Sequence, residues 1–273
     1  MPFPNFDPVL LQIGPIAIRW YGLAYVAGIL LGWRYMVSLV RKPALWSGGG
    51  PPATPLQIDD LILWITFGII IGGRLGHVVF YTPEIIWTNP IEILMTWRGG
   101  MSFHGGVIGV LVAVLIFTRR GKLDLLSLGD LVTSAAPMGL FLGRIANFIK
   151  PELWGRPTQV PWGIVFPDAG PFPRHPSQLY EAALEGIVLF LILFWAGRGA
   201  KLLKRRGVVA GLFFLGYGLI RIGLETVREP DQGLDHFPLG LTMGMILSGP
   251  MVLGGAWLIW RGLSQPVQDH EPA

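Results

Sequence analysis

The stretch GRIANFIKPELWGR, residues 143–156, closes an apolar run that begins at Leu126. It places a cation and an amide, Arg144 and Asn147, near the end of a segment long enough to cross a bilayer. An arginine at the centre of a transmembrane helix is unfavourable by roughly 2.5 to 3.5 kcal/mol on translocon-based scales, so it usually faces a cavity, a partner or a substrate. The run therefore predicts a membrane-spanning helix that carries part of a functional site.

Composition extends this interpretation to the whole chain. The 273 residues are 52% hydrophobic and only 14% charged, whereas a soluble domain carries roughly 25% charged residues. The apolar residues form seven long segments, at residues 16–40, 58–81, 101–118, 126–149, 178–196, 208–227 and 239–260. We therefore predict an all-α, polytopic integral membrane protein with about seven transmembrane helices, forming a single integral membrane domain over residues 1–273.

The charge distribution predicts the orientation of these segments. Basic residues cluster in the first, third and fifth connections, at residues 41–42, 119–122 and 198–206. Such clusters mark cytoplasmic loops, so the N-terminus is expected outside and the C-terminus inside. This pattern also accounts for the net charge of +4 without any nucleic-acid partner. The connection at residues 151–177, rich in proline and tryptophan, is expected to form a small ordered cap on the outer face.

Several chemistries are excluded by residues that the chain lacks. It has no cysteine, so it has no disulfide, no thiolate metal site and no thiol nucleophile of its own. Neither a His-Glu-x-x-His metal motif nor a Gly-x-Ser-x-Gly nucleophile elbow around Ser177 is present. Any thiol chemistry must therefore use the sulfur of a partner.

Arg144 and Asn147 lie three residues apart and so share one helical face. A guanidinium group matches the paired oxygens of a phosphate or carboxylate, and partial exclusion of water strengthens that interaction. The alternative is an interhelix salt bridge between Arg144 and a buried acid.

Arg221 and Glu225 lie four residues apart in the sixth apolar segment, and Arg74 lies toward the outer end of the second. The Arg221–Glu225 pair could simply be self-neutralising, which lowers the cost of burial without a further function. Nevertheless, three apolar segments each carry an arginine within reach of the outer leaflet. This shared depth favours a common anionic ligand.

His104 lies in the glycine-rich stretch GGMSFHGG, residues 99–106, at the outer start of the third segment. Its ordinary pKa makes histidine a natural proton acceptor near neutral pH. The alternative is a hydrogen-bonded structural histidine. Its expected depth matches that of the three arginines.

Small residues recur four apart along several apolar segments, as in Gly28/Gly32, Gly72/Gly76 and Gly105/Gly109. Such pairs let helix backbones approach closely. We therefore expect tight helix packing at these positions.

Taken together, these blocks resemble the prolipoprotein diacylglyceryl transferases of the bacterial inner membrane. Residues 143–155 are similar to the signature of that family, a Gly-Arg-x-Gly/Ala-Asn-Phe segment ending in Glu-x-x-Gly. The similarity continues through RWYG at 19–22, GGRLG at 72–76, GMSFHGG at 100–106, RHPSQLYE at 174–181, residues 217–225 and GLTMG at 240–244. The chain departs from the pattern at Lys150, where the signature usually has Asn, and at His77, where Tyr is common.

The resemblance implies a multi-pass enzyme of the bacterial inner (cytoplasmic) membrane with a periplasmic N-terminus. It would transfer the diacylglyceryl group of phosphatidylglycerol to the thiol of the lipobox cysteine of a preprolipoprotein, releasing glycerol phosphate. Its partners would be these two substrates and membrane lipid, with no metal and no cofactor. The implied catalytic residues are His104, Arg144 and Arg221. Substrate binding is expected to involve Tyr21, Arg74, Arg144, Asn147, Glu152, Gly155 and Glu225.

A different class of protein would also account for intramembrane arginines. A transporter or lipid-binding protein could hold an anionic solute without any chemistry. Such proteins often have duplicated halves, and the sequence shows no internal repeat. The transferase is therefore the favoured interpretation.

Overall fold

A computed structural model of the chain describes residues 1–4, 6–14, 16–48, 50–96, 99–229 and 241–267. Residue 240 of the GLTMG block and most of the predicted connection at 228–238 lie outside the described residues. The chain forms two compact units, one of residues 1–51 and 129–273 and the other of residues 52–128. Each unit is described by itself below.

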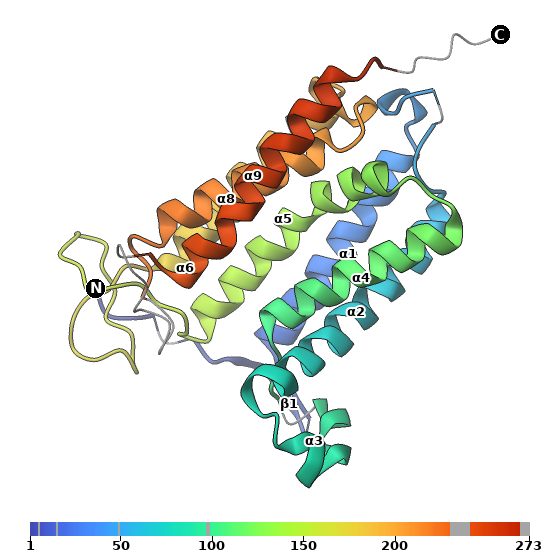
Figure 1. Cartoon of the computed structure of the whole chain (residues 1–273). Helices are drawn as coiled ribbons and strands as arrows, with labels where there is room; N and C mark the ends of the chain where they lie inside the picture. The colour runs from blue at the N-terminus through green and yellow to red at the C-terminus, as the bar shows by residue number, and fades with distance from the viewer. Residues whose placement is uncertain (5, 15, 49, 97–98, 230–240, 268–273) are drawn as a thin grey trace. The chain divides into compact units, whose positions relative to one another are not determined.

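Most of the chain is helical (Figure 1). Six helices are long and apolar enough to cross a membrane: α1 (Trp20–Val40), α2 (Pro55–Tyr81), α4 (Phe103–Gly121), α5 (Leu125–Ile149), the continuous helix Ser177–Gly199, and α9 (Met243–Ser264). The sixth predicted segment, residues 208–227, forms α8 (Val208–Leu224), which is apolar but has only 17 residues. The chain is thus a polytopic, mostly helical membrane protein, and six of its described helices reach full spanning length.

The continuous helix Ser177–Gly199 is not a uniform α-helix. It consists of α6 (Ser177–Glu181), a π-helical stretch η4 (Ala182–Val188), α7 (Leu189–Phe194) and a second π-helical stretch η5 (Trp195–Gly199). Wider π turns inside α-helices are frequent at functional sites. The first of them follows directly after Glu181.

The unit of residues 52–128 is built on α2 and α4, which pack along each other through glycines. A Cβ on Gly72 would contact the carbonyl oxygen of Gly105 and lie 2.7 Å from the Cα of Gly109. This confirms the close packing expected for these pairs. Along the chain, the short elements α3 (Ile85–Thr88) and η2 (Pro90–Leu94) connect α2 to α4.

The unit of residues 1–51 and 129–273 begins with a two-stranded antiparallel hairpin of β1 (Val9–Ile13) and β2 (Ile16–Arg19). Residues 16–19 were expected to open the first transmembrane helix, and this part of the prediction is wrong, because they pair with β1 instead. The helix α1 that follows packs closely on α5, since a Cβ on Gly28 would lie 3.1 Å from the Cα of Gly139. The helices α8 and α9 lie side by side (Figure 1).

A buried carboxylate joins α5 to α8. Asp130 is fully buried, and its two oxygens accept hydrogen bonds from the backbone N–H groups of Gly207, at 2.6 Å, and Ala210, at 2.7 Å. Asp130 thereby satisfies two of the N–H groups that the start of α8 would leave without a helical partner. The short elements η1 (Pro43–Leu45) and η6 (Leu202–Lys204) complete this unit.

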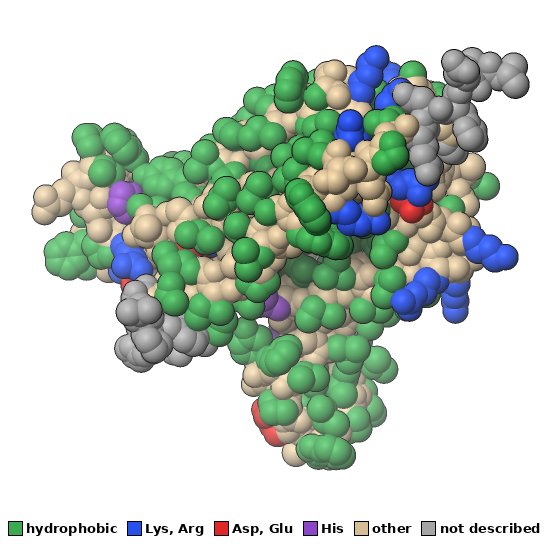
Figure 2. Space-filling view, turned by 45° about the horizontal axis from the view of Figure 1, so that its top comes forward, with side chains coloured by type: hydrophobic (Ala, Val, Ile, Leu, Met, Phe, Trp, Pro, Cys, Tyr) green, Lys and Arg blue, Asp and Glu red, His purple; other side chains and the backbone are tan. Residues whose placement is uncertain are grey.

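The surface agrees with a membrane environment. Hydrophobic side chains cover much of the visible face (Figure 2), and large ones such as Phe67 and Leu253 are exposed. Soluble proteins rarely expose apolar patches of this extent.

Candidate active site

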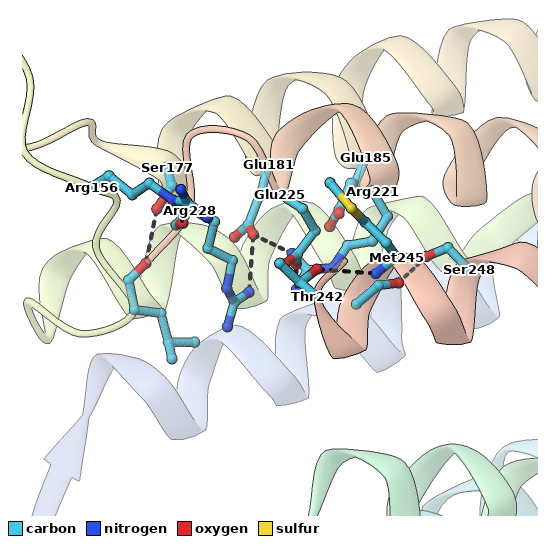
Figure 3. A network of polar contacts seen from close by, with 12 residues as sticks. Arg156, Ser177, Glu181, Glu185, Arg221, Glu225, Arg228, Thr242, Met245 and Ser248 are labelled. Atoms are coloured by element: carbon cyan, nitrogen blue, oxygen red, sulfur yellow. Dashed lines mark hydrogen bonds and ion pairs between the residues drawn. The ribbon is translucent and has the colours of Figure 1, made fainter. Parts of the chain in front are cut away.

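The carboxylate of Glu181, at the end of α6, is the centre of a buried charged network. Its Oε1 accepts hydrogen bonds from Nη1 of Arg221, at 2.8 Å, and from Nη1 of Arg228, at 3.1 Å (Figure 3). Its Oε2 lies 3.1 Å from Nε of Arg144. One buried carboxylate therefore holds three arginines, which come from α5, from α8 and from the turn after α8.

Two further carboxylates of the described residues belong to the network. An Oε2 of Glu185 lies 3.4 Å from Nη2 of Arg144, and Oε1 of Glu225 lies 2.5 Å from Nη2 of Arg221. Charged groups are buried at an acceptable cost only when they are paired. Among the described residues, three guanidinium groups and three carboxylates satisfy this condition, and these six side chains have no net charge when all are ionised.

The network is polarised although its charges balance. The side chains of Glu181 and Glu185 are completely buried, whereas those of Arg144 and Arg221 keep 14% and 13% of their surface exposed. Arg144 and Arg221 are therefore the more accessible members of these ion pairs. A guanidinium group that is partly accessible is suited to an anion such as a phosphate.

Glu225 has a second stabilising neighbour in α9. A Cβ on Gly244, in the first turn of that helix, would overlap the carboxyl group of Glu225. A negative charge beside a helix N-terminus is stabilised by the helix dipole. Thr242 caps this end of α9 by accepting a hydrogen bond from the N–H of Met245 at 3.2 Å (Figure 3).

The segment after α5 folds back onto the end of that helix. Glu152 accepts hydrogen bonds from Nδ2 of Asn147, at 2.7 Å, and from Nζ of Lys150, at 2.6 Å. The start of α6 holds this segment in place, because Ser177 and Gln178 donate hydrogen bonds to the carbonyl oxygens of Leu153 and Glu152. Asn147 and Glu152, both expected at the site, thus contact each other directly.

Gly155 lies where a side chain would not fit. Its N–H donates to the carbonyl oxygen of His175 at 2.9 Å, and an added Cβ would lie 2.5 Å from the carbonyl oxygen of Val227. The next residue, Arg156, donates from its backbone N–H to the same Val227 oxygen and from Nε to the carbonyl oxygen of Arg228. The connection at 151–177 is therefore ordered and packs against the turn that carries Arg228.

Aromatic rings pack between the same connection and the end of α5. Phe166 is fully buried, and its ring centroid lies 5.9 Å from that of Trp154 and 6.2 Å from that of Phe148. His175 lies near the end of the connection at 151–177, and its Nδ1 is 3.2 Å from the hydroxyl of Tyr180. Partial burial lowers the pKa of the His175 imidazole.

Tyr21, at the start of α1, lies beside the end of α5. The Nζ of Lys150 is 5.6 Å from the centroid of its ring, within the range of a cation–π interaction. A small cavity of about 140 Å³ lies here, lined by Pro8, Arg19, Trp20, Tyr21, Ala146, Ile149 and Lys150. Tyr21 is therefore close to the Asn147–Glu152 segment.

The other two expected site residues belong to the unit of residues 52–128. Arg74 is buried, and its guanidinium group donates hydrogen bonds to the carbonyl oxygens of Glu92, Ile93, Gly99 and Gly100. These contacts hold the connection between α2 and α4. His104 is exposed in the first turn of α4, which Ser102 caps through the N–H of Gly105. That His104 and Arg74 share a site with Arg144 and Arg221 stays a prediction.

The sequence interpretation did not assign a site role to Glu181, Glu185 or Arg228. Glu181 and Glu185 lie four residues apart within an apolar segment, and intramembrane carboxylates of this kind usually mark functional sites. That signal was available in the sequence. The salt bridges weighed as alternatives for Arg144 and Arg221 are present, and they are parts of a single network.

Comparison with known proteins identifies the family. The family model for prolipoprotein diacylglyceryl transferase matches residues 8–261. Three similar relatives are named phosphatidylglycerol-prolipoprotein diacylglyceryl transferase. The protein from Phenylobacterium zucineum is 64% identical over 276 positions (97% of this chain, 96% of the relative). That from Caulobacter vibrioides is 55% identical over 302 positions (100% of each), and that from Methylocella silvestris is 56% identical over 264 positions (95% and 96%). The chain therefore belongs to the prolipoprotein diacylglyceryl transferase family.

Proposed function

We propose that this chain transfers the diacylglyceryl group of phosphatidylglycerol to the thiol of the lipobox cysteine of a preprolipoprotein. The products are a thioether-linked precursor and glycerol phosphate, in the first step of bacterial lipoprotein maturation. The observation that carries the proposal is the convergence of Arg144 and Arg221 on Glu181, with both arginine side chains more exposed than this fully buried carboxylate. Such an arrangement suits the phosphate of a lipid headgroup.

In this mechanism the two arginines bind the phosphate. The thiolate sulfur attacks the glycerol carbon that carries it, so a sulfur–carbon bond forms while the carbon–oxygen bond to phosphate breaks. Negative charge increases on the leaving phosphate, and fixed cations stabilise it in an environment that contains little water. Arg144 and Arg221 therefore act on the leaving group.

A base must take the thiol proton, because the thiolate is the reactive nucleophile. His104 is proposed for this role, and its exposed imidazole is compatible with proton exchange. The acceptor sulfur has to come from the peptide, since the chain has no cysteine.

The remaining residues are proposed to position the headgroup or the arginines. Asn147, Glu152 and Tyr21 lie along the end of α5, and Glu225 orients Arg221. Gly155 acts through close packing under the turn of Arg228. Arg74 is proposed to contribute from the connection that it holds.

The proposed setting is the bacterial inner membrane, with the N-terminus in the periplasm and the C-terminus in the cytoplasm. The chain would act as one integral membrane domain, with residues 151–177 as a cap on the outer face. Its partners are phosphatidylglycerol, other membrane lipid and the lipobox segment of the acceptor. The basic connections at residues 119–122 and 198–206 support this orientation.

The direct test incubates the purified protein with phosphatidylglycerol and a lipobox peptide, and follows the peptide mass. The expected result is a mass increase by one diacylglyceryl group, which Arg144→Ala and Arg221→Ala reduce strongly. Near-normal transfer by both variants would overturn the phosphate clamp. Lipid binding or flux with an unchanged peptide would favour the binding or transport class instead.

A second set of variants tests whether His104 is the base that takes the thiol proton. His104→Ala and His104→Gln are both expected to slow transfer strongly. Full activity of His104→Gln at every pH would place the base elsewhere.

A further inference from the structure

Glu185 is the least compensated carboxylate of the charged network. It is completely buried in the π-helical stretch η4. Among the described residues, its Oε1 has no hydrogen-bond partner, and its Oε2 has Nη2 of Arg144 at 3.4 Å. A buried carboxylate in this setting is costly to keep ionised.

The other two carboxylates of the network are better held. Oε2 of Glu181 and Oε1 of Glu225 also lack a hydrogen bond among the described residues, but they lie 3.1 Å and 2.5 Å from guanidinium nitrogens of Arg144 and Arg221. Oε1 of Glu185 has no such ion pair among the described residues. A proton that enters the network therefore binds most favourably at Glu185.

Charged and titratable groups face Glu185 from each neighbouring helix. Arg144 faces it from α5, Arg221 and Tyr217 from α8, and Glu181 from one turn earlier in its own helix. The two arginines stabilise the ionised form of Glu185, and Glu181 opposes it. Arg144 and Arg221 are also the residues proposed to bind phosphate, so the charge state of Glu185 depends on what they bind.

The charge count makes this dependence specific. Among the described residues, the three arginines and three carboxylates balance when all six side chains are ionised. A phospholipid phosphate adds one negative charge and engages the two arginines that stabilise Glu185. In a medium of low dielectric constant, such an imbalance is opposed strongly. Uptake of one proton would restore neutrality.

We propose that binding of an anionic phospholipid at Arg144 and Arg221 is coupled to uptake of a proton by Glu185. The empty site then holds Glu185 as a carboxylate paired with Arg144, and the occupied site holds it as a neutral carboxylic acid. This inference rests on the proposed function, because it requires the two arginines to bind the lipid phosphate. It adds a proton-binding site to the chain.

Isothermal titration calorimetry tests the coupling directly. The purified full chain, in detergent, is titrated with short-chain phosphatidylglycerol in Tris and in PIPES, two buffers whose ionisation enthalpies differ widely. The difference between the two binding enthalpies gives the number of protons exchanged. About one proton is expected to be taken up by the unaltered protein, at a pH where Glu185 is ionised in the empty site.

Glu185→Gln keeps the shape of the side chain and is neutral in both states. It is expected to bind the lipid with little or no proton uptake and with an affinity that does not change with pH. Glu84→Gln is the matched control, because Glu84 is exposed in the other unit. Proton uptake by this control is expected to equal that of the unaltered protein.

A second measurement uses only the unaltered protein, so the inference can still be tested if Glu185→Gln fails to fold. The dissociation constant of the unaltered protein for the lipid is expected to rise with pH, by up to about tenfold per pH unit, between the pKa of Glu185 in the empty site and its pKa in the occupied site, as linkage to one proton requires. Binding without proton uptake, or equal uptake by folded Glu185→Gln, would overturn the inference. Absence of any lipid binding would instead contradict the proposed function.

Discussion

The carboxylate of Glu181 lies 2.8 Å from the Nη1 of Arg221, a residue forty positions further along the chain. Both side chains belong to apolar helices, and the acid is completely buried. The same carboxylate also contacts Arg144 and Arg228. The orientation of the proposed phosphate-binding arginines therefore depends on a residue that is itself inaccessible to a substrate.

Glu181→Gln should destabilise the protein and reduce transfer. Removal of one partner from a buried ion pair typically costs about 3 to 5 kcal/mol, because the remaining charges stay buried without compensation. We expect a lower thermal unfolding midpoint and at least about a tenfold lower kcat/KM, since each tenfold step corresponds to about 1.4 kcal/mol. Glu181→Asp should recover part of both. A glutamine variant with unchanged stability and rate would show that the contacts to Glu181 contribute little.

Arg221→Lys tests the geometry of the clamp apart from its charge. Lysine keeps the positive charge but cannot present the two guanidinium nitrogens that contact Glu181 and Glu225. We expect kcat/KM to fall by about ten- to a hundredfold, equivalent to roughly 1.4 to 2.7 kcal/mol of transition-state stabilisation. Arg119→Lys, at an exposed position, is the control and should retain full activity. Equal activity of both variants would mean that charge alone suffices.

Gly155→Ala should weaken the contact between residues 151–177 and the turn of Arg228. The new methyl group would lie 2.5 Å from the carbonyl oxygen of Val227, so the backbone must shift. Overpacking of this kind costs about 1 to 3 kcal/mol, and a loss of stability and of transfer should be seen together. The control is Gly249→Ala in α9, where a Cβ would have no atom of the described residues within 4 Å.

Asp130→Ala should destabilise α8 without a direct effect on chemistry. Loss of an N-terminal capping side chain costs about 0.5 to 2 kcal/mol, and here two backbone N–H groups lose their acceptor at once. Thermal unfolding should therefore occur at a lower temperature, while the KM for phosphatidylglycerol of the folded fraction stays within about twofold, roughly 0.4 kcal/mol. Asp168→Asn, at an exposed position, should leave the unfolding temperature unchanged. A large change in KM for Asp130→Ala would show that the structure at the start of α8 affects phosphatidylglycerol binding.

Lys150→Asn addresses the position where this chain departs from the family signature. Lys150 is 53% exposed and pairs with Glu152, and exposed ion pairs contribute only about 0 to 1 kcal/mol. The hydrogen bond between Asn147 and Glu152 does not require Lys150. We therefore expect near-normal stability and transfer. A large rise in KM for phosphatidylglycerol would instead assign the lysine a direct role in headgroup binding.

The membrane helices could be predicted because their requirements are local. The predicted segment 58–81 corresponds to α2 (Pro55–Tyr81), and 126–149 to α5 (Leu125–Ile149). One predicted segment begins too early: residues 16–18 are apolar and lie just before α1, yet residues 16–19 form β2. Their pairing with β1 depends on a partner strand, which a single apolar run does not reveal.

The candidate site was predictable only in part. Arg144, Asn147, Arg221 and Glu225 were visible as polar residues in apolar helices, where burial makes each of them costly. Glu181 and Glu185 carried the same signal, but residue spacing along one helix cannot identify partners on another. The contacts of Arg144 therefore remained open between a phosphate and a buried acid.

The sequence by itself determined that the chain spans a membrane, where its helices lie and which charges they bury. Those properties follow from the length and polarity of each segment, because every spanning segment must satisfy its own backbone hydrogen bonds. Only the tertiary structure decided which charges meet. The convergence of Arg144, Arg221 and Arg228 on Glu181 depends on the packing of α5, α6 and α8. Electrostatic pairing acts over a few ångströms between residues that are distant in the chain.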